Sequence, residues 1–67
     1  MKTKLYLTNE LFDLTVIQHA AADYGHLAHI AISQRGKDWV ITFRNCKYDP
    51  DRTVKEFENY LIGLANQ

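Results

Sequence analysis

A chain of 67 residues and 7.8 kDa has room for one domain. Domains this small bury only about 60% of the surface that the unfolded chain exposes, so nearly every apolar residue must contribute to one core. Hydrophobic residues make up 46% and charged residues 24%, which is typical of a folded domain and excludes a disordered chain. Eight basic residues balance eight acidic ones, which argues against nucleic acid as the main partner because phosphate binding needs a basic surplus.

The cysteine count and the hydropathy pattern restrict the compartment. Cys46 is the only cysteine, so neither an internal disulfide nor a four-cysteine zinc site can form. Small domains of oxidising compartments usually carry several disulfides. With no apolar leader at Met1–Lys4, this predicts a cytoplasmic protein. No apolar run approaches the roughly 18 residues of a membrane span, so no membrane partner is expected.

Three segments alternate apolar and polar residues and predict strands: Lys4–Thr8, Leu27–Ser33 and Trp39–Phe43. The intervening Gln34–Lys37 predicts a turn, because Gly36 can take a positive φ, so the last two strands should pair as a hairpin. One face of such a sheet is strongly apolar and the other is mixed. The residues expected on the mixed, open face are Lys4, Tyr6, Thr8, His29, Ala31, Ser33, Val40, Thr42 and Arg44.

The first helix is predicted between the first two strands. Asp13 is a good N-cap for a helix from about Leu14 to Tyr24, because its carboxylate can accept from the free amides of the first turn. Gly25 then stands where a left-handed residue often ends a helix. The apolar stripe of this helix is Ile17, Ala20, Ala21 and Tyr24.

The second helix has two candidate starts. Asp49-Pro50 reads as an N-cap followed by proline at the first helical position. Thr53–Glu56 is a capping box that would start the helix one turn later. Either helix reaches about Ala65, with Tyr60 and Ile62 off its apolar stripe, where they can be exposed. That stripe is Val54, Phe57, Leu61 and Leu64.

The order of elements is therefore β-α-β-β-α, and residues 1–67 form a single small α+β domain. A three-stranded sheet with two helices packed on one face is the simplest way to bury these stripes. The strand order is left open by the sequence. The uncovered sheet face could bind a partner or pair with a second copy. The candidate partner-binding residues on it are Tyr6, His29, Thr42 and Arg44.

Two segments carry a family resemblance. In Leu11–Tyr24 an aromatic and a helix-start residue precede Ile-x-x-Ala-Ala-Ala-x-Tyr, and Glu56–Leu61 reads Glu-Phe-x-Asn-x-Leu. With the hairpin between them, these segments resemble the HxsD-like family over about Lys4–Ala65, with the last leucine one place early. This family consists of small accessory proteins of the bacterial His-Xaa-Ser system. The resemblance implies a setting beside radical-SAM enzymes that modify a peptide, and it implies no catalytic residue for this component.

The histidines and the cysteine are the residues that could carry chemistry. His19 and Asp23, four apart, share one helix face, and with His26 they could hold a divalent metal. No fourth ligand is evident, so a solvated helix face beside a loop histidine is the preferred interpretation, and the sequence does not say whether the three converge. Cys46 lies between Arg44 and Lys47, whose charges favour a thiolate. Because no histidine is close in sequence to act as its base, an incidental thiol is preferred.

No catalytic constellation is recognisable. The chain has no phosphate-binding glycine loop and no nucleophile elbow, and it is too short to shield much of a pocket. We therefore expect no enzyme, no catalytic residue, no metal and no cofactor.

The leading hypothesis is a protein- or peptide-interaction module, an accessory of a radical-SAM peptide-modification system. Its open sheet face, a free strand edge or its second helix would hold the partner, and strand addition is the simplest mode. The first alternative is a homodimeric structural protein that uses the same surfaces. The second is a weak binder of single-stranded nucleic acid, suggested by the basic hairpin residues Arg35, Lys37, Arg44 and Lys47.

Overall fold

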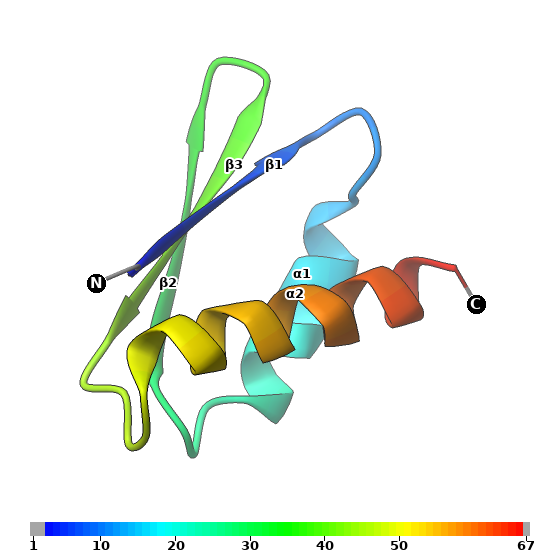
Figure 1. The fold of residues 1–67 in the computed structure, drawn as a ribbon. Helices are drawn as coiled ribbons and strands as arrows, with labels where there is room; N and C mark the ends of the chain where they lie inside the picture. The colour runs from blue at the N-terminus through cyan, green and yellow to red at the C-terminus, as the bar shows by residue number, and fades with distance from the viewer. Residues whose placement is uncertain (1–2, 67) are drawn as a thin grey trace.

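The computed structural model describes residues 3–66 and has three strands and two helices in the order β-α-β-β-α (Figure 1). This confirms the predicted α+β class and order of elements. Met1 and Lys2, on which the expectation of a missing leader partly rests, and Gln67 lie outside the described residues. The elements are β1 (Lys4–Thr8), α1 (Leu14–Asp23), β2 (His29–Arg35), β3 (Asp38–Arg44) and α2 (Pro50–Ala65).

The sheet has the strand order β1-β3-β2, and β3 is antiparallel to both neighbours. The β2–β3 hairpin occupies one side of β3, so β1 pairs with the remaining side. β1 and β2 therefore run parallel to each other at opposite edges, and α1 carries the chain between them (Figure 1). The sequence could predict the hairpin but not this order, because alternation shows which face of a strand is buried and not which strand lies beside it.

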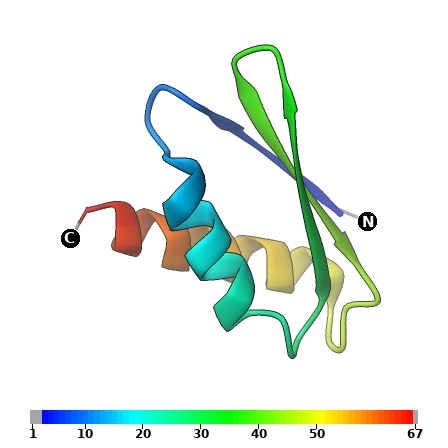
Figure 2. The same cartoon turned by 180° about the vertical axis from the view of Figure 1, so that it is seen from behind.

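Both helices pack on the same face of the sheet, as predicted (Figures 1 and 2). Aromatic rings join the layers: Phe57 of α2 makes edge-on contacts with Phe43 of β3, at 5.2 Å between ring centroids, and with Tyr24 at the end of α1, at 5.5 Å. The buried residues of the core are Leu5, Leu7, Ile17, Ala20, Ala28, Ile41, Phe43, Val54, Phe57 and Leu61. Among residues 3–66 no helix is long and apolar enough to cross a membrane.

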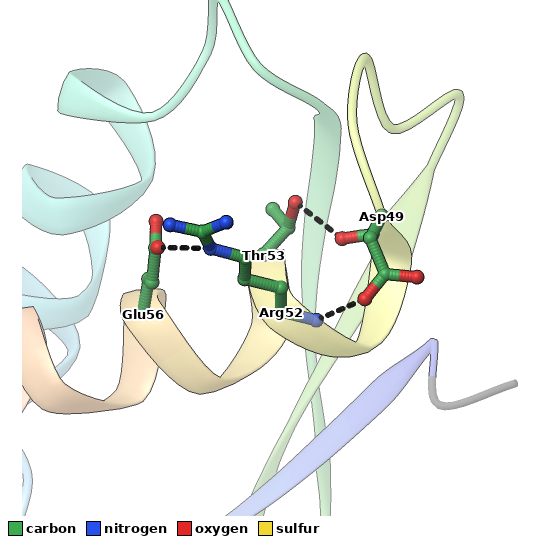
Figure 3. Close-up of polar contacts among 4 residues, drawn as sticks. All are labelled: Asp49, Arg52, Thr53 and Glu56. Carbon is green, nitrogen blue, oxygen red and sulfur yellow. Dashed lines mark hydrogen bonds and ion pairs between the residues drawn. The ribbon is translucent and has the colours of Figure 1, made fainter.

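The start of α2 resolves the two alternatives in favour of Asp49. Its side chain accepts a hydrogen bond of 2.9 Å from the Arg52 amide, and Pro50 occupies the first turn, where its missing N–H is not needed (Figure 3). Thr53 lies inside the helix instead of capping it. Its hydroxyl and its amide each donate to the Asp49 carbonyl at 2.9 Å.

α1 begins at Leu14, as predicted, but the bonding at its N-cap and the conformation at its C-terminal end differ from the prediction. Asp13 occupies the N-cap position with extended backbone, but its side chain makes no capping hydrogen bond. Gly25 is not left-handed: among the described glycines only Gly36 has a positive φ, of 60°. The helix ends instead in ordinary turns, in which the Tyr24 amide donates to Ala20 and the Gly25 amide to Ala22.

The second strand also differs from the prediction, since it begins at His29 and not at Leu27 and runs through Arg35. The amides of Leu27 and Ala28 both donate to the Tyr24 carbonyl, which keeps these two residues in the turn after α1. At the other end the connection is only Gly36-Lys37, so Gln34 and Arg35 pair with β3. A positive φ at Gly36 suits a two-residue hairpin turn, and that short turn lengthens both strands.

Candidate functional site

The sheet face opposite the helices is uncovered, and the strand register orders its side chains in rows. Every second residue of each strand contributes its side chain to this face, because side chains alternate between the two faces of a sheet. From one end of the sheet to the other the rows are His29–Arg44, Ala31–Thr42–Lys4, Ser33–Val40–Tyr6 and Arg35–Asp38–Thr8.

The four residues predicted to bind a partner all lie on this face. His29 is opposite Arg44 at one end of the sheet, and both are exposed. Thr42 is two residues from Arg44 on the central strand and is half-buried. Tyr6 lies one row further on the outer strand β1 and is 56% exposed. The structure thus places the four residues on one surface, and their role in binding stays a prediction.

Val40 shows that the middle of this face is covered by its own neighbours. It is only 8% exposed although it does not belong to the helix-side core. Its position on the central strand explains this, since Tyr6 and Ser33 flank it in the same row. The apolar centre of the face is therefore small, and most of the exposed surface of the face belongs to the residues around Val40.

Charge is divided between the two layers of the molecule. The open face carries Lys4, Arg35 and Arg44, and none of these makes an ion pair with any described residue. Asp38 is the one acidic residue on this face of the described sheet. The two helices and their N-caps hold six acidic and two basic residues. A net charge of zero thus conceals a basic open face. The sequence missed the contribution of Arg35, because its segment reads as a turn until the short Gly36-Lys37 connection is known.

The edge of β2 leaves backbone groups unpaired. Phe43 N–H donates to the Thr3 carbonyl and Asn9 N–H to the Lys37 carbonyl, each at 2.8 Å. In an antiparallel pair, residues that exchange backbone hydrogen bonds alternate with residues that do not. The odd-numbered residues of β3 therefore form backbone hydrogen bonds with β1, and the even-numbered residues form them with β2. The bonded residues of β2 are then His29, Ala31, Ser33 and Arg35. The amides and carbonyls that point away from the sheet belong to Ile30, Ile32 and Gln34.

The β2 edge is the less protected of the two sheet edges. β1 has five residues, begins with a lysine, and contacts α2. β2 has seven residues and no charged side chain or proline between His29 and Gln34. Charges, proline and short length are what discourage pairing at an edge, and β2 lacks them over most of its length. In Figure 2 this strand borders the sheet on the side away from β1.

The candidate metal cluster is incomplete. His19 Nε2 lies 3.5 Å from Asp23 Oδ2, as their four-residue spacing predicts. Within residues 3–66 no group of three or more histidine, cysteine, aspartate or glutamate side chains is placed to hold a metal, so His26 does not complete the site. Asp23 instead accepts a hydrogen bond from the hydroxyl of Tyr60, which ties α1 to α2.

This link corrects the expectation that Tyr60 is exposed. Tyr60 is half-buried and packs on the core beside Tyr24, at 5.5 Å between ring centroids. Its hydrogen bond to Asp23 raises its pKa above the ordinary 10.0, with a smaller contribution from burial. Burial, together with the charge of Glu56, raises the pKa of Tyr24. Of the pair expected on the outside of the helix only Ile62 is exposed, at 43%. No hydrophobic spacing in the sequence could have revealed a hydroxyl that reaches another helix.

The remaining candidates have structural roles. Cys46 lies in the loop after β3, is half-buried and packs against the core. Trp39 and Phe43, the strongest stacking side chains, are on the helix-covered face, where Trp39 Nε1 donates to the Phe12 carbonyl at 2.9 Å. Tyr6 and His29 carry the rings left on the open face of the described sheet.

A shallow groove of about 390 Å³ lies at the start of α2. Figure 3 shows how its polar residues are engaged: Asp49 accepts from Arg52 and Thr53, and Arg52 Nε donates to Glu56 at 2.9 Å. These groups satisfy one another, and the carboxylate of Asp49 occupies the helix end where an anion would bind. The remaining residues that line the groove are Leu27 and Tyr48.

Comparison with known proteins gives no relative: the chain matches no family model, no curated protein and no solved structure.

Proposed function

We propose that the protein is a non-catalytic module that holds an extended peptide segment of a partner along the outer edge of β2. The observation that carries the proposal is the run of unpaired backbone groups at Ile30, Ile32 and Gln34, next to an uncovered sheet face. A strand added there can form hydrogen bonds with three amides and three carbonyls. Main-chain bonds of this kind give affinity in strand addition, while side-chain contacts give selectivity.

Side chains on both faces support this edge as a binding surface. On the helix side, Ile30 and Ile32 are half-buried and pack against the core, so their outer surfaces remain for a partner to cover. On the open side, Ala31 and Ser33 are small and exposed, which leaves space above the edge. His29 and Arg44, two of the predicted binding residues, lie at one end of this surface. Thr42 lies on the neighbouring strand β3, and Tyr6 lies on β1 at the opposite edge of the sheet.

We place this module in the bacterial cytoplasm, as an accessory of a radical-SAM enzyme that modifies a peptide. The support is the resemblance of Leu11–Tyr24 and Glu56–Leu61 to the HxsD-like family, together with a single cysteine. In that setting the peptide on β2 would be the substrate of the enzyme or a segment of the enzyme itself.

Affinity capture tests the proposal. Tagged protein is incubated with lysate of the native host, and bound proteins are identified by mass spectrometry. The edge variant Gln34→Pro removes an outward-facing amide without removing a bond to β3, and Lys55→Ala on the outer surface of α2 is the control. We expect a radical-SAM enzyme or a short peptide to be captured by the wild type and the control and lost with Gln34→Pro. Equal capture by all three proteins would contradict the role of the β2 edge.

A homodimer is the second candidate, because the β2 edge can pair with itself. An antiparallel pair centred on Ile32 brings the outward-facing groups of all three edge residues into register with those of the second copy. The mass in solution separates the two candidates. A concentration-dependent dimer that Gln34→Pro abolishes would assign the edge to a second copy. A protein that stays monomeric at high concentration would exclude the homodimer.

A further inference from the structure

We propose that the β2 edge selects segments in which acidic residues alternate with apolar ones. This inference rests on the proposed function, because it names the chemistry of the peptide held at the same edge. A peptide that extends the sheet points alternate side chains to opposite faces. The two faces of β2 differ in polarity and charge, so the peptide must differ in the same way.

The helix-side face of the edge requires apolar partners. A peptide residue hydrogen-bonded to Ile30 or Ile32 places its side chain on that face, next to the half-buried isoleucine. Covering these side chains removes further apolar surface from water, which favours binding. A charged side chain at these positions would lose water without gaining a partner.

The open face of the edge favours acidic partners. Arg35 lies at one end of β2, and Arg44 lies opposite His29 at the other, about 20 Å away at the usual rise per strand residue. Neither arginine has an ion pair with a described residue, and between them β2 presents only Ala31 and Ser33. A peptide strand added to β2 lies about 5 Å from β2 and about 10 Å from β3, so Arg35 borders the peptide directly and Arg44 reaches it over His29.

The charge distribution also disfavours basic peptides. Lys4 adds a third cation to the open face, while Asp38 is its only carboxylate among the described residues. A basic peptide would meet Arg44 at one end of the edge and Arg35 at the other, where Asp38 lies opposite Arg35 on β3, on the side away from the peptide. Such rim charges act on the association rate and on the salt dependence, and they select against wrong partners.

Three synthetic nonapeptides test the inference on the intact protein: alternating Val–Glu, alternating Val–Ser and alternating Val–Lys, each with a fluorescent label read by anisotropy. We expect the glutamate peptide to bind about tenfold more tightly than the lysine peptide at low salt, as two or three exposed charge pairs can provide. High salt should reduce this ratio. Gln34→Pro should abolish binding of the glutamate peptide.

Charge reversal on the two layers gives the matched control. Arg35→Glu should lower the preference for glutamate over lysine at least several-fold, since it exchanges one attractive contact for a repulsive one. Lys55→Glu changes the net charge equally but lies on the exposed side of α2, so the preference should stay within twofold of the wild type. Equal effects of the two variants would overturn the proposal, because the selection would then come from net charge.

Other outcomes separate this inference from the proposed function. Equal binding of the three peptides, lost with Gln34→Pro, would overturn the charge preference and leave strand addition at β2 intact. If no peptide binds, while lysate capture still depends on Gln34, the inference fails alone. If both peptide binding and Gln34-dependent capture are absent, the proposed function fails as well. A dimer that the glutamate peptide cannot displace would assign the edge to a second copy and overturn the inference.

Discussion

Proline at two neighbouring positions of β2 tests the hydrogen-bond pattern on which the proposed edge depends. The amide of Ser33 points toward Val40 of β3, while the amide of Gln34 points away from the sheet. Proline removes an N–H group, so it is tolerated at an edge strand where that group faces outward. We therefore expect Ser33→Pro to damage the fold and Gln34→Pro to leave it nearly unchanged.

The size of the difference follows from the groups that each change leaves unpaired. Ser33→Pro removes a ladder hydrogen bond, worth about 1 kcal/mol, and leaves the Val40 carbonyl without it in the middle of the sheet, which costs about 1–3 kcal/mol. The hydroxyl of Ser33, 3.5 Å from that carbonyl, is lost as well. Gln34→Pro removes only an exposed side-chain contact of 3.4 Å to Gly36, and proline restricts the unfolded chain, so the net change should stay within about 1 kcal/mol.

Thermal and urea denaturation followed by circular dichroism measure both variants. A domain of this size has a total stability of about 3–10 kcal/mol, so a loss of about 2–4 kcal/mol in Ser33→Pro is a large share of it. With a shift of about 4–8 °C for each kcal/mol, the melting temperatures of the two variants should differ by at least about 4 °C. If Gln34→Pro were as destabilising as Ser33→Pro, the outward-facing assignment of Ile30, Ile32 and Gln34 would be wrong.

Three further predictions use pairs or single changes elsewhere in the chain. Asp49→Ala should cost about 1 kcal/mol in a urea titration because a capping bond is lost, whereas Asp13→Ala, at a cap without such a bond, should cost far less; the reverse order would contradict the cap assignment. Leu61→Ala should cost about 2–5 kcal/mol and Ile62→Ala under about 1 kcal/mol, since only the first is fully buried; equal losses would refute the placement of α2 on the sheet. The pKa of Tyr60 is raised in the folded state, so its contribution to stability is present below pH 10.0 and is lost as the pH rises through the folded value. The free energy of unfolding should therefore fall as the pH rises in this range, and Tyr60→Phe should reduce that fall. An unchanged pH dependence in Tyr60→Phe would exclude the link between the helices.

The sequence was informative where a local pattern decides the structure. Alternation in Trp39–Phe43 predicts one buried face, and the helical spacing of Val54, Phe57, Leu61 and Leu64 predicts another. The apolar residues on these faces are buried, except Trp39 and Leu64, which are half-buried. The Asp49-Pro50 pair is likewise a local signal. The competing capping box fails because a helix that starts at Pro50 already satisfies the Thr53 hydroxyl.

What the sequence could not predict depends on geometry between distant segments. Strand order places β1 beside β3 through contacts between residues that are 30 or more positions apart in the chain. The contact of Tyr60 with Asp23 spans 37 residues and carries no periodic signal. The candidate edge needed the same information: the outward direction of the amides in β2 follows only from the register of both neighbouring pairs. Arg35 joined the open face only once the hairpin turn was reduced to two residues.

The arrangement also explains how so small a domain can keep a surface for binding. The ten described residues of the buried core cluster all belong to the helix side of the sheet or to the segments that pack on it, and none of them has its side chain on the open face. Substitutions of Arg35 or Arg44 should therefore change binding with little effect on folding, since sites that share no contacts act almost independently. Ile30 and Ile32 are the exception, because they pack against the core and border the edge. Their substitution should change both stability and binding, so they cannot serve as clean tests, and the edge is best probed through Gln34 and the arginines.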